Sequence, residues 1–238
     1  MRAALLVALA ACSGNANQPC GDCGDGGADA AMHDAPRAVD APRPPDAPSP
    51  PPPADAGVPP GGKRVFVTSL RYSANLRAEG GQATGRASAD AICQTLADAA
   101  SLGGTFRAWL STSDLDAIDH ITGTGPWYRL DGAVAFPNHA SLGTTPQVPI
   151  SIDEKLGHPD PFYESWTGTG VGGHLAATSL SSPTCLDWTS TVDSDSIKGV
   201  LGVFGEGSGE LDGTGPQWTN YGAGFCTPFA RHLYCFEE

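Results

Sequence analysis

The pattern of apolar positions predicts a folded domain that begins near residue 63. Residues 64–69, Arg-Val-Phe-Val-Thr-Ser, are rich in β-branched and aromatic side chains and are interpreted as an alternating strand. From Ser88, which can cap a helix, apolar residues recur at helical spacing as far as about Leu102. We therefore expect a strand and a long helix, followed by a second strand over residues 106–111.

The rest of this pattern predicts one more helix and then mainly short strands. Ser113 can cap a short helix with Leu115 and Ile118 on its apolar side. Short strand candidates then alternate with Gly- and Pro-rich turns, and the last covers residues 231–236. Two helices followed by many short strands indicate an α+β fold. Such a domain needs bulky apolar side chains in its core, and we expect four tryptophans to supply them: Trp109, Trp166, Trp188 and Trp218.

The N-terminus predicts export and a lipid anchor. Residues 1–11 combine the basic Arg2 with a short apolar run, and Leu9-Ala10-Ala11-Cys12 resembles the lipobox of bacterial lipoproteins. We expect residues 1–11 to be removed as a signal peptide and Cys12 to be acylated, which anchors a protein to a membrane without a spanning helix. The alternative is an ordinary secretory signal in which Cys12 is incidental. Ser13, beside the lipid site, favours the outer membrane in the Gram-negative type of sorting.

Residues 12–62 are expected to form a disordered tether that is rich in Pro, Ala and Asp. Asp-Ala-Pro recurs three times, and Pro prevents regular secondary structure while the Asp side chains repel one another. Cys20 and Cys23 lie within this segment. We expect them to form a small local disulfide, with intermolecular pairing or metal binding as alternatives. The tether would hold the domain at residues 63–238 away from the membrane.

Charge and cysteine content exclude several classes of partner. The formal net charge of the chain is -13, and residues 63–238 carry ten Lys and Arg against 19 Asp and Glu, which gives -9. Such an acidic domain repels phosphate and sulfate polymers, so neither nucleic acid nor a heparin-like polyanion is expected as a partner. When Cys12 is assigned to lipid, six of the seven cysteines remain, and an oxidising compartment would pair them in three disulfides.

Four motifs in the domain carry a resemblance to a known fold. They are residues 89–111 around Cys93, Ser165-Trp-Thr-Gly-Thr169, Cys185-Leu-Asp-Trp-Thr189 and His232-Leu-Tyr-Cys-Phe-Glu237. Together they resemble endostatin, a domain of the wider C-type-lectin-like fold, across roughly residues 63–238. They resemble still more closely a domain of unknown function that is found in bacterial surface lipoproteins. The sequence therefore predicts a disulfide-stapled, C-type-lectin-like domain.

The resemblance implies the disulfides Cys93–Cys235 and Cys185–Cys226, whereas the spacing of four cysteines alone permits three pairings. It does not carry over calcium. Calcium-dependent lectins of this fold use acidic-Pro-Asn and Trp-Asn-Asp motifs, but Phe136-Pro137-Asn138 and Trp218-Thr219-Asn220 lack the acidic ligands. No metal site and no cofactor are therefore expected.

Few residues are candidates for ligand contact or catalysis. Trp127, in Gly-Pro-Trp-Tyr, is the aromatic residue that we expect to be exposed for ligand contact. Asp116, Asp119 and His120 share a predicted helix and are interpreted as a solvated face rather than a catalytic pair. Asp153 and Glu154 are adjacent and are expected to point in different directions, which disfavours acid–base chemistry.

These observations predict a non-enzymatic binding or adhesion module, displayed as a lipoprotein on the outer membrane or cell surface. Its ligand is expected to be an extracellular protein or glycan. One alternative is an exported enzyme, because the same fold includes the formylglycine-generating oxidases, which use a reactive cysteine pair. A structural spacer without a small ligand is the other alternative.

Overall fold

The computed structural model describes the globular part of the chain. The described residues are 57–159, 163–192, 194–205, 213–227 and 229–238. The expected signal peptide, the lipid site at Cys12, the cysteine pair Cys20 and Cys23, and the expected tether as far as residue 56 therefore lie outside the described residues.

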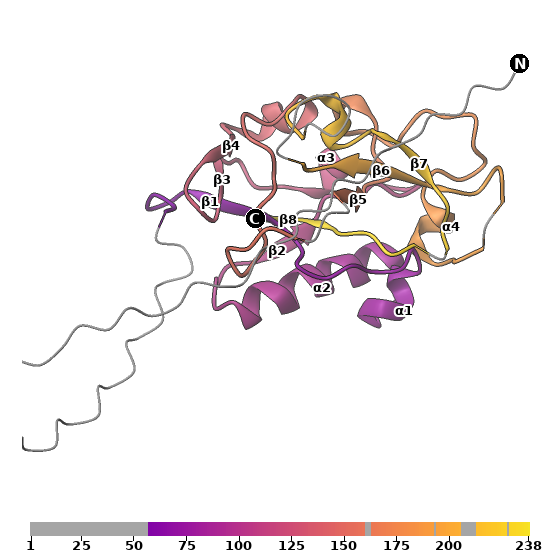
Figure 1. Ribbon diagram of the computed structural model, residues 1–238, viewed down its shortest axis with the longest axis horizontal. Coiled ribbons are helices and arrows are strands. Elements are labelled where there is room, and N and C mark those ends of the chain that lie inside the picture. The colour runs from indigo at the N-terminus through magenta and orange to yellow at the C-terminus, as the bar shows by residue number, and fades with distance from the viewer. Residues whose placement is uncertain (1–56, 160–162, 193, 206–212, 228) are drawn as a thin grey trace, which may run out of the picture. The chain divides into compact units, whose positions relative to one another are not determined.

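The larger of two sheets has five strands in the order β2-β8-β1-β3-β4 (Figure 1). The first strand, β1, pairs antiparallel with the last strand, β8, and parallel with β3. The predicted first, second and last strands all form, although the last begins three residues later than expected. The strand bounds are β1 Lys63–Val67, β2 Phe106–Ala108, β3 Trp127–Arg129, β4 Val134–Phe136 and β8 Tyr234–Glu237.

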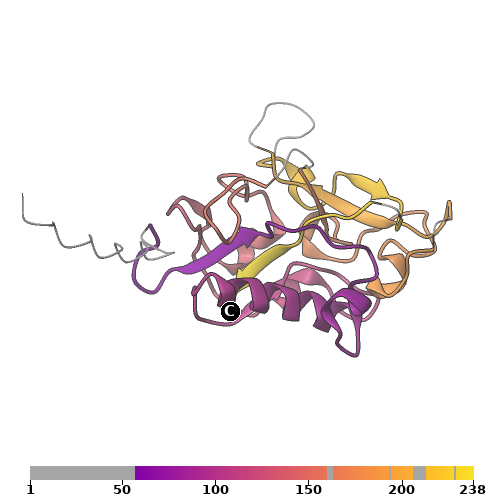
Figure 2. The ribbon, with the colours of Figure 1, turned by 60° about the horizontal axis from the view of Figure 1, so that its bottom comes forward.

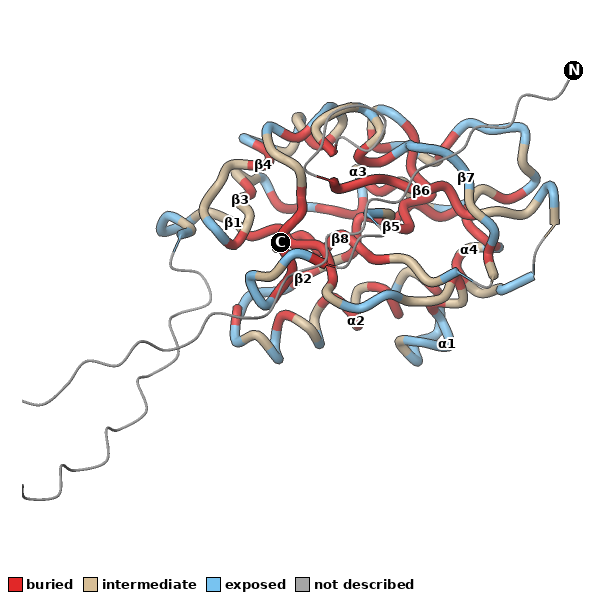
Figure 3. The backbone as a smooth tube through the Cα atoms, in the orientation of Figure 1, coloured by how far each residue is buried: buried red, intermediate tan, exposed pale blue. Residues whose placement is uncertain are grey.

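The two central strands of this sheet are buried on both faces (Figure 3). Because side chains alternate along a strand, Phe66 and Cys235 point into one apolar cluster, with the helix α2. Val65, Tyr234 and Phe236 point into a second, aromatic cluster on the opposite face. Every side chain of Val65–Val67 is fully buried, so β1 is a core strand and has no solvated face.

Helix α2 (Gly85–Ala99) runs along one face of the five-stranded sheet (Figure 2). It begins before the predicted cap, because the Thr84 hydroxyl accepts a hydrogen bond from the backbone N–H of Ala87. Ser88 is instead buried inside the helix, where its hydroxyl accepts a 2.9 Å hydrogen bond from the backbone N–H of Gln82. Ser88 thereby fixes the loop that enters the helix.

A second, three-stranded sheet and several short helices complete the α+β fold. This sheet has the antiparallel order β5-β6-β7, with β5 Glu164–Trp166, β6 Gly199–Val203 and β7 Gly222–Gly224. The second predicted helix forms over fewer residues, with Asp116 before its first turn. The other helical segments are α1 Leu76–Gly80, α3 Ala117–His120, α4 Cys185–Trp188, and the 3-10 turns His139–Gly143, Val171–Gly173 and Pro216–Trp218.

The four tryptophans that were expected in the core are buried, but the prediction for the fifth is wrong. Trp127 is fully buried rather than exposed for ligand contact. It lies on β3, next to β1, and its ring meets Phe236 edge-on at 5.9 Å between centroids. Its indole N–H donates to the backbone oxygen of Glu237 at 2.8 Å. Trp127 therefore closes the aromatic core beneath the C-terminus.

Both disulfides implied by the resemblance are present. Cys93–Cys235 joins α2 to β8, and Cys185–Cys226 joins α4 to the segment after β7. Such bridges persist in oxidising compartments, which fits a domain that works outside the cytoplasm. No helix within the described ranges is long and apolar enough to cross a membrane.

Removing either disulfide should lower the free energy of unfolding. Cys93–Cys235 spans 142 residues and Cys185–Cys226 spans 41. Because the second bridge lies within the loop that the first one closes, it shortens that loop. Replacing Cys93 and Cys235 together with Ala should therefore cost up to about 4 to 5 kcal/mol, and replacing Cys185 and Cys226 up to about 4 kcal/mol. Urea denaturation of the full chain measures both losses. Peptide mapping without reduction is the control, and a Cys93–Cys185 peptide would contradict the pairing.

Candidate functional site

The segment α4 is a single turn of left-handed helix. Cys185, Leu186, Asp187 and Trp188 have φ angles of 48°, 58°, 51° and 61°. Each L-residue in this conformation costs roughly 1–2 kcal/mol, and runs of such residues are rare. None of the four is glycine or asparagine, the residues that adopt it most easily. A turn of this kind persists only where its surroundings determine it, and such sites often carry function.

Contacts at both ends hold the left-handed turn. At its start, Cys185 is bonded to Cys226. At its end, Trp188 is fully buried, and its indole N–H donates to the backbone oxygen of Ser111 at 2.8 Å. The ring of Trp188 also packs against Trp166, with 5.7 Å between centroids. One covalent bond and one buried aromatic side chain therefore fix the conformation of the two residues between them.

The turn directs Asp187 at the loop that follows β2. The Asp187 carboxylate accepts hydrogen bonds from the backbone N–H of Ser113 at 2.8 Å and from its hydroxyl at 2.5 Å. A third bond, of 3.0 Å, comes from the hydroxyl of Thr184. These bonds join two segments that lie 74 residues apart in the sequence.

Helix α2 meets the same turn through a glycine. A Cβ atom on Gly85 would collide with the backbone oxygen of Asp187 and would lie 2.5 Å from the Cβ atom of Trp188. The absence of a side chain at the first residue of α2 thus allows the helix start and the left-handed turn to touch. Three segments that are distant in sequence, around residues 85, 113 and 187, meet here.

A cavity of about 360 Å³, lined mainly by polar residue types, opens between these three segments. This volume is at the lower end of the range for small-molecule sites. Eight of the ten lining residues carry a charged or hydroxyl group, although carbon atoms make up more than half of the exposed wall. These eight are Arg77, Thr84, Arg86, Thr112, Ser113, Asp114, Asp187 and Thr189.

Arg86 and Asp114 are paired across the cavity wall. One guanidinium nitrogen of Arg86 lies 3.1 Å from the Asp114 carboxylate and donates to the hydroxyl of Thr112 at 2.7 Å. That hydroxyl donates in turn to Asp114 at 2.7 Å. The bond from Thr112, and then the charge and hydrogen bond of Arg86, lower the pKa of Asp114. In contrast, the Arg77 guanidinium has no ion-pair or hydrogen-bond partner among the described residues.

A smaller cavity of about 240 Å³ lies on the other side of the loop at residues 112–114, and Asp116 and Asp119 line it. Asp116 accepts a 2.6 Å hydrogen bond from the backbone N–H of Leu175 and lies 2.7 Å from the His174 ring nitrogen. Burial alone would raise the pKa of Asp116, but these two partners lower it. Asp116 is therefore already occupied by the protein.

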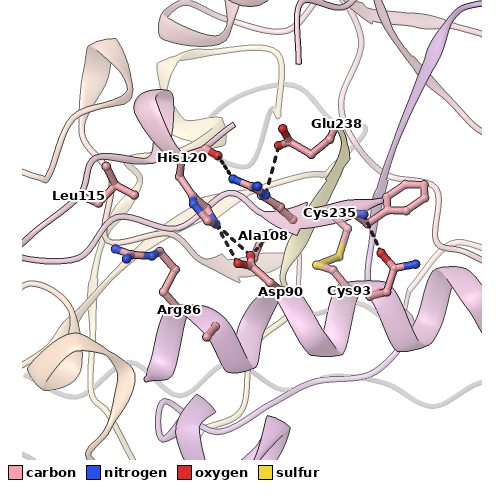
Figure 4. A network of polar contacts seen from close by, with 12 residues as sticks. Arg86, Asp90, Cys93, Ala108, Leu115, His120, Cys235 and Glu238 are labelled. Atoms are coloured by element: carbon pink, nitrogen blue, oxygen red, sulfur yellow. Dashed lines mark hydrogen bonds and ion pairs between the residues drawn. A yellow bond between two sulfur atoms is a disulfide. The ribbon is translucent and has the colours of Figure 1, made fainter. Parts of the chain in front are cut away.

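The interpretation of Asp116, Asp119 and His120 as one solvated face is wrong for His120. Its side chain is buried, and its Nε2 atom lies 3.0 Å from the Asp90 carboxylate (Figure 4). Asp90 also accepts the backbone N–H of Ala108 at 2.9 Å. The pair therefore links α2, β2 and α3. It lies behind the cavity rather than in it, because neither residue lines the wall.

The adjacent acids Asp153 and Glu154 do point apart, and each is satisfied by the protein. Asp153 accepts the backbone N–H groups of Lys155 and Gly157, whereas Glu154 accepts the backbone N–H and the hydroxyl of Ser69. Within the part of the chain that the structure describes, no group of three or more His, Cys, Asp or Glu side chains is arranged to hold a metal ion.

No known family model matches this chain, and a search of the curated proteins finds no match. The site is therefore interpreted from its own geometry.

One wall of the cavity belongs to a motif that is recognisable in the sequence, and the other walls do not. The sequence analysis includes the Cys185–Thr189 motif, but the amino acids in this motif do not indicate a left-handed turn. Arg77, Arg86 and Asp114 were not predicted as site residues, because their meeting depends on how α1, α2 and the loop after β2 pack together. The signal that was available locally is Gly85, a poor helix former at the start of a long helix.

We expect Gly85→Ala to destabilise the domain by on the order of 1–3 kcal/mol, because the new methyl group must displace backbone atoms of the turn. Gly222→Ala is the matched control, since a Cβ atom there meets nothing within 4 Å. It should change stability by less than about 0.5 kcal/mol. Urea denaturation compares the two, and equal stability would show that α2 does not contact the turn.

The left-handed conformation is tested at Leu186, which is 46% exposed. Leu186→Gly removes the steric cost of a positive φ, whereas Leu70→Gly removes a leucine of similar exposure, 54%, whose φ is not positive. Both variants add the same chain entropy to the unfolded state. Leu186→Gly should therefore be more stable than Leu70→Gly by about 1–2 kcal/mol in thermal or urea denaturation. An equal loss in both would contradict the left-handed turn.

Proposed function

We propose that this chain is an exported surface lipoprotein whose domain is a non-enzymatic binding or adhesion module of the C-type-lectin-like, endostatin-like kind. In this proposal residues 1–11 are the signal peptide and Cys12 carries the lipid. Residues 12–62 are a tether, and residues 63–238 bind an extracellular glycan or protein on the outside of a Gram-negative type of cell.

The observation that carries the proposal is a cavity whose backbone and two carboxylates are held in place by the protein itself. The Cys185–Cys226 bridge and the buried Trp188 hold one wall, and helix α2 supplies the wall opposite. Binding to such a cavity loses little conformational entropy, because few side chains need to be ordered. A rigid cavity on a stapled domain is what a displayed binding module requires.

The state of the cysteines supports binding over the oxidase alternative. That chemistry needs a reactive cysteine pair, and all four cysteines of the domain form disulfides that join separate elements. The cavity also lacks the usual parts of a nucleophilic site. Its wall includes no histidine or cysteine, and the Ser113 hydroxyl donates to the weakly basic carboxylate of Asp187 rather than to an imidazole.

Arrays of glycans and matrix proteins, probed with the full chain, test the proposal. We expect saturable binding that persists in EDTA. Ala83→Trp places a large ring in the cavity and should abolish binding. Val171→Trp is the control, because Val171 is 68% exposed and lies outside the cavity wall. Circular dichroism would confirm that both variants fold.

Three outcomes would contradict this function. Binding that survives Ala83→Trp would remove the cavity from the proposal. Binding abolished by EDTA would indicate a metal-dependent lectin. Thiol labelling of the folded chain that finds a reactive cysteine in the domain would favour the oxidase.

A further inference from the structure

In the cavity beside the left-handed turn, the two carboxylates have hydrogen-bond partners, whereas two of the donors, on Arg77 and Thr84, are available to a ligand. Its two carboxylates are already occupied. Asp187 accepts three hydrogen bonds from Ser113 and Thr184, and Asp114 accepts from Thr112 and Arg86. Few carboxylate lone pairs are therefore left for a ligand.

The donors on the opposite wall are not occupied in the same way. The guanidinium of Arg77 carries five N–H donors and has no partner among the described residues. The hydroxyl of Thr84 accepts from Ala87, so its own proton remains available to a ligand. A ligand rich in acceptors and negative in charge would satisfy these groups.

Charge and size restrict that ligand further. Two arginines and two aspartates line the cavity, so its wall carries no net charge. Arg86 is paired with Asp114, and Asp187 is held by hydrogen bonds from Ser113 and Thr184, so Arg77 is the cation that a ligand carboxylate can pair with. A guanidinium can bind a carboxylate through two parallel hydrogen bonds. Thr84, Thr112 and Thr189 also line the cavity, whose volume of about 360 Å³ is at the small end of the range for small-molecule sites. The hydroxyls of Thr112 and Thr189 already donate to Asp114 and to the backbone oxygen of Leu186, so the Thr189 oxygen can accept from a sugar hydroxyl while Thr84 donates to one.

The acidity of the domain does not contradict this assignment. The net charge of -9 over residues 63–238 repels a long polyanion, which would lie across many surface carboxylates. A ligand with one charge experiences mainly the groups within about 8 Å, because salt screens the others at physiological ionic strength. The cavity can therefore select a lone carboxylate on a domain that excludes heparin-like chains.

We propose that this cavity binds an acidic sugar, of the uronic or sialic acid type, with its carboxylate held by Arg77 and its hydroxyl groups by the threonine-lined wall. This inference rests on the proposed binding function and names its ligand class.

Titration calorimetry of the full chain with glucuronate and N-acetylneuraminate tests the inference. Glucose and N-acetylglucosamine are the neutral controls, and acetate is the control for a carboxylate without a sugar. We expect at least one acidic sugar to bind, and the neutral sugars and acetate to bind at least about tenfold more weakly.

Variants of one residue identify the contact. Arg77→Ala should weaken binding about 10- to 100-fold, because it removes a charge-assisted pair of hydrogen bonds. Arg77→Lys should recover only part of the affinity, since an ammonium group lacks the planar fork of donors. Lys198→Ala is the matched control, because it removes the same charge from a residue that lies over Phe225 and outside the cavity wall. It should leave the affinity unchanged.

The outcomes separate this inference from the proposed function. Suppose that array ligands bind the chain, fail to bind Ala83→Trp and bind Arg77→Ala with unchanged affinity. The cavity is then a binding site, but not one for a carboxylate. If acetate binds as tightly as the acidic sugars, the sugar part of the inference is wrong. If neither acidic sugar binds, the inference fails, and the array result alone decides the function.

Discussion

The pairing of the first and last strands is the constraint on which the rest of this domain depends. β1 and β8 lie side by side at the centre of the five-stranded sheet, and alternate side chains of each enter opposite cores. Cys93–Cys235 then attaches α2 to β8. Because the two ends of the domain meet near the centre of this sheet, the segments between them fold as loops and layers around it.

A segment as unfavourable as Cys185–Trp188 is kept in place by its own contacts. The steric cost of four left-handed residues is offset by a disulfide, by the buried ring of Trp188 and by the hydrogen bonds of Asp187. What the strained turn provides is position. The turn brings its own backbone against Gly85 and the Asp187 carboxylate against Ser113, and so forms one wall of the cavity.

The cavity also shows why net charge is a poor guide to a local site. The domain is strongly acidic, yet the carboxylates in the cavity wall are occupied and Arg77 is not. A long polymer responds to the whole surface, whereas a small ligand responds to a few nearby groups. A module can therefore exclude polyanions and still hold one carboxylate.

The sequence by itself determined the α+β class, the long helix around Ile92, the buried tryptophans of three motifs and, through a resemblance, both disulfides. These features follow from the local periodicity of apolar residues and from short sequence motifs that are recognisable without the structure. Only the tertiary structure decided that Trp127 is buried, that His120 pairs with Asp90, and that Arg77 and Asp187 share a cavity. Each of those results depends on contacts between segments that are far apart in the chain. A local sequence pattern does not show which distant segments the fold brings together.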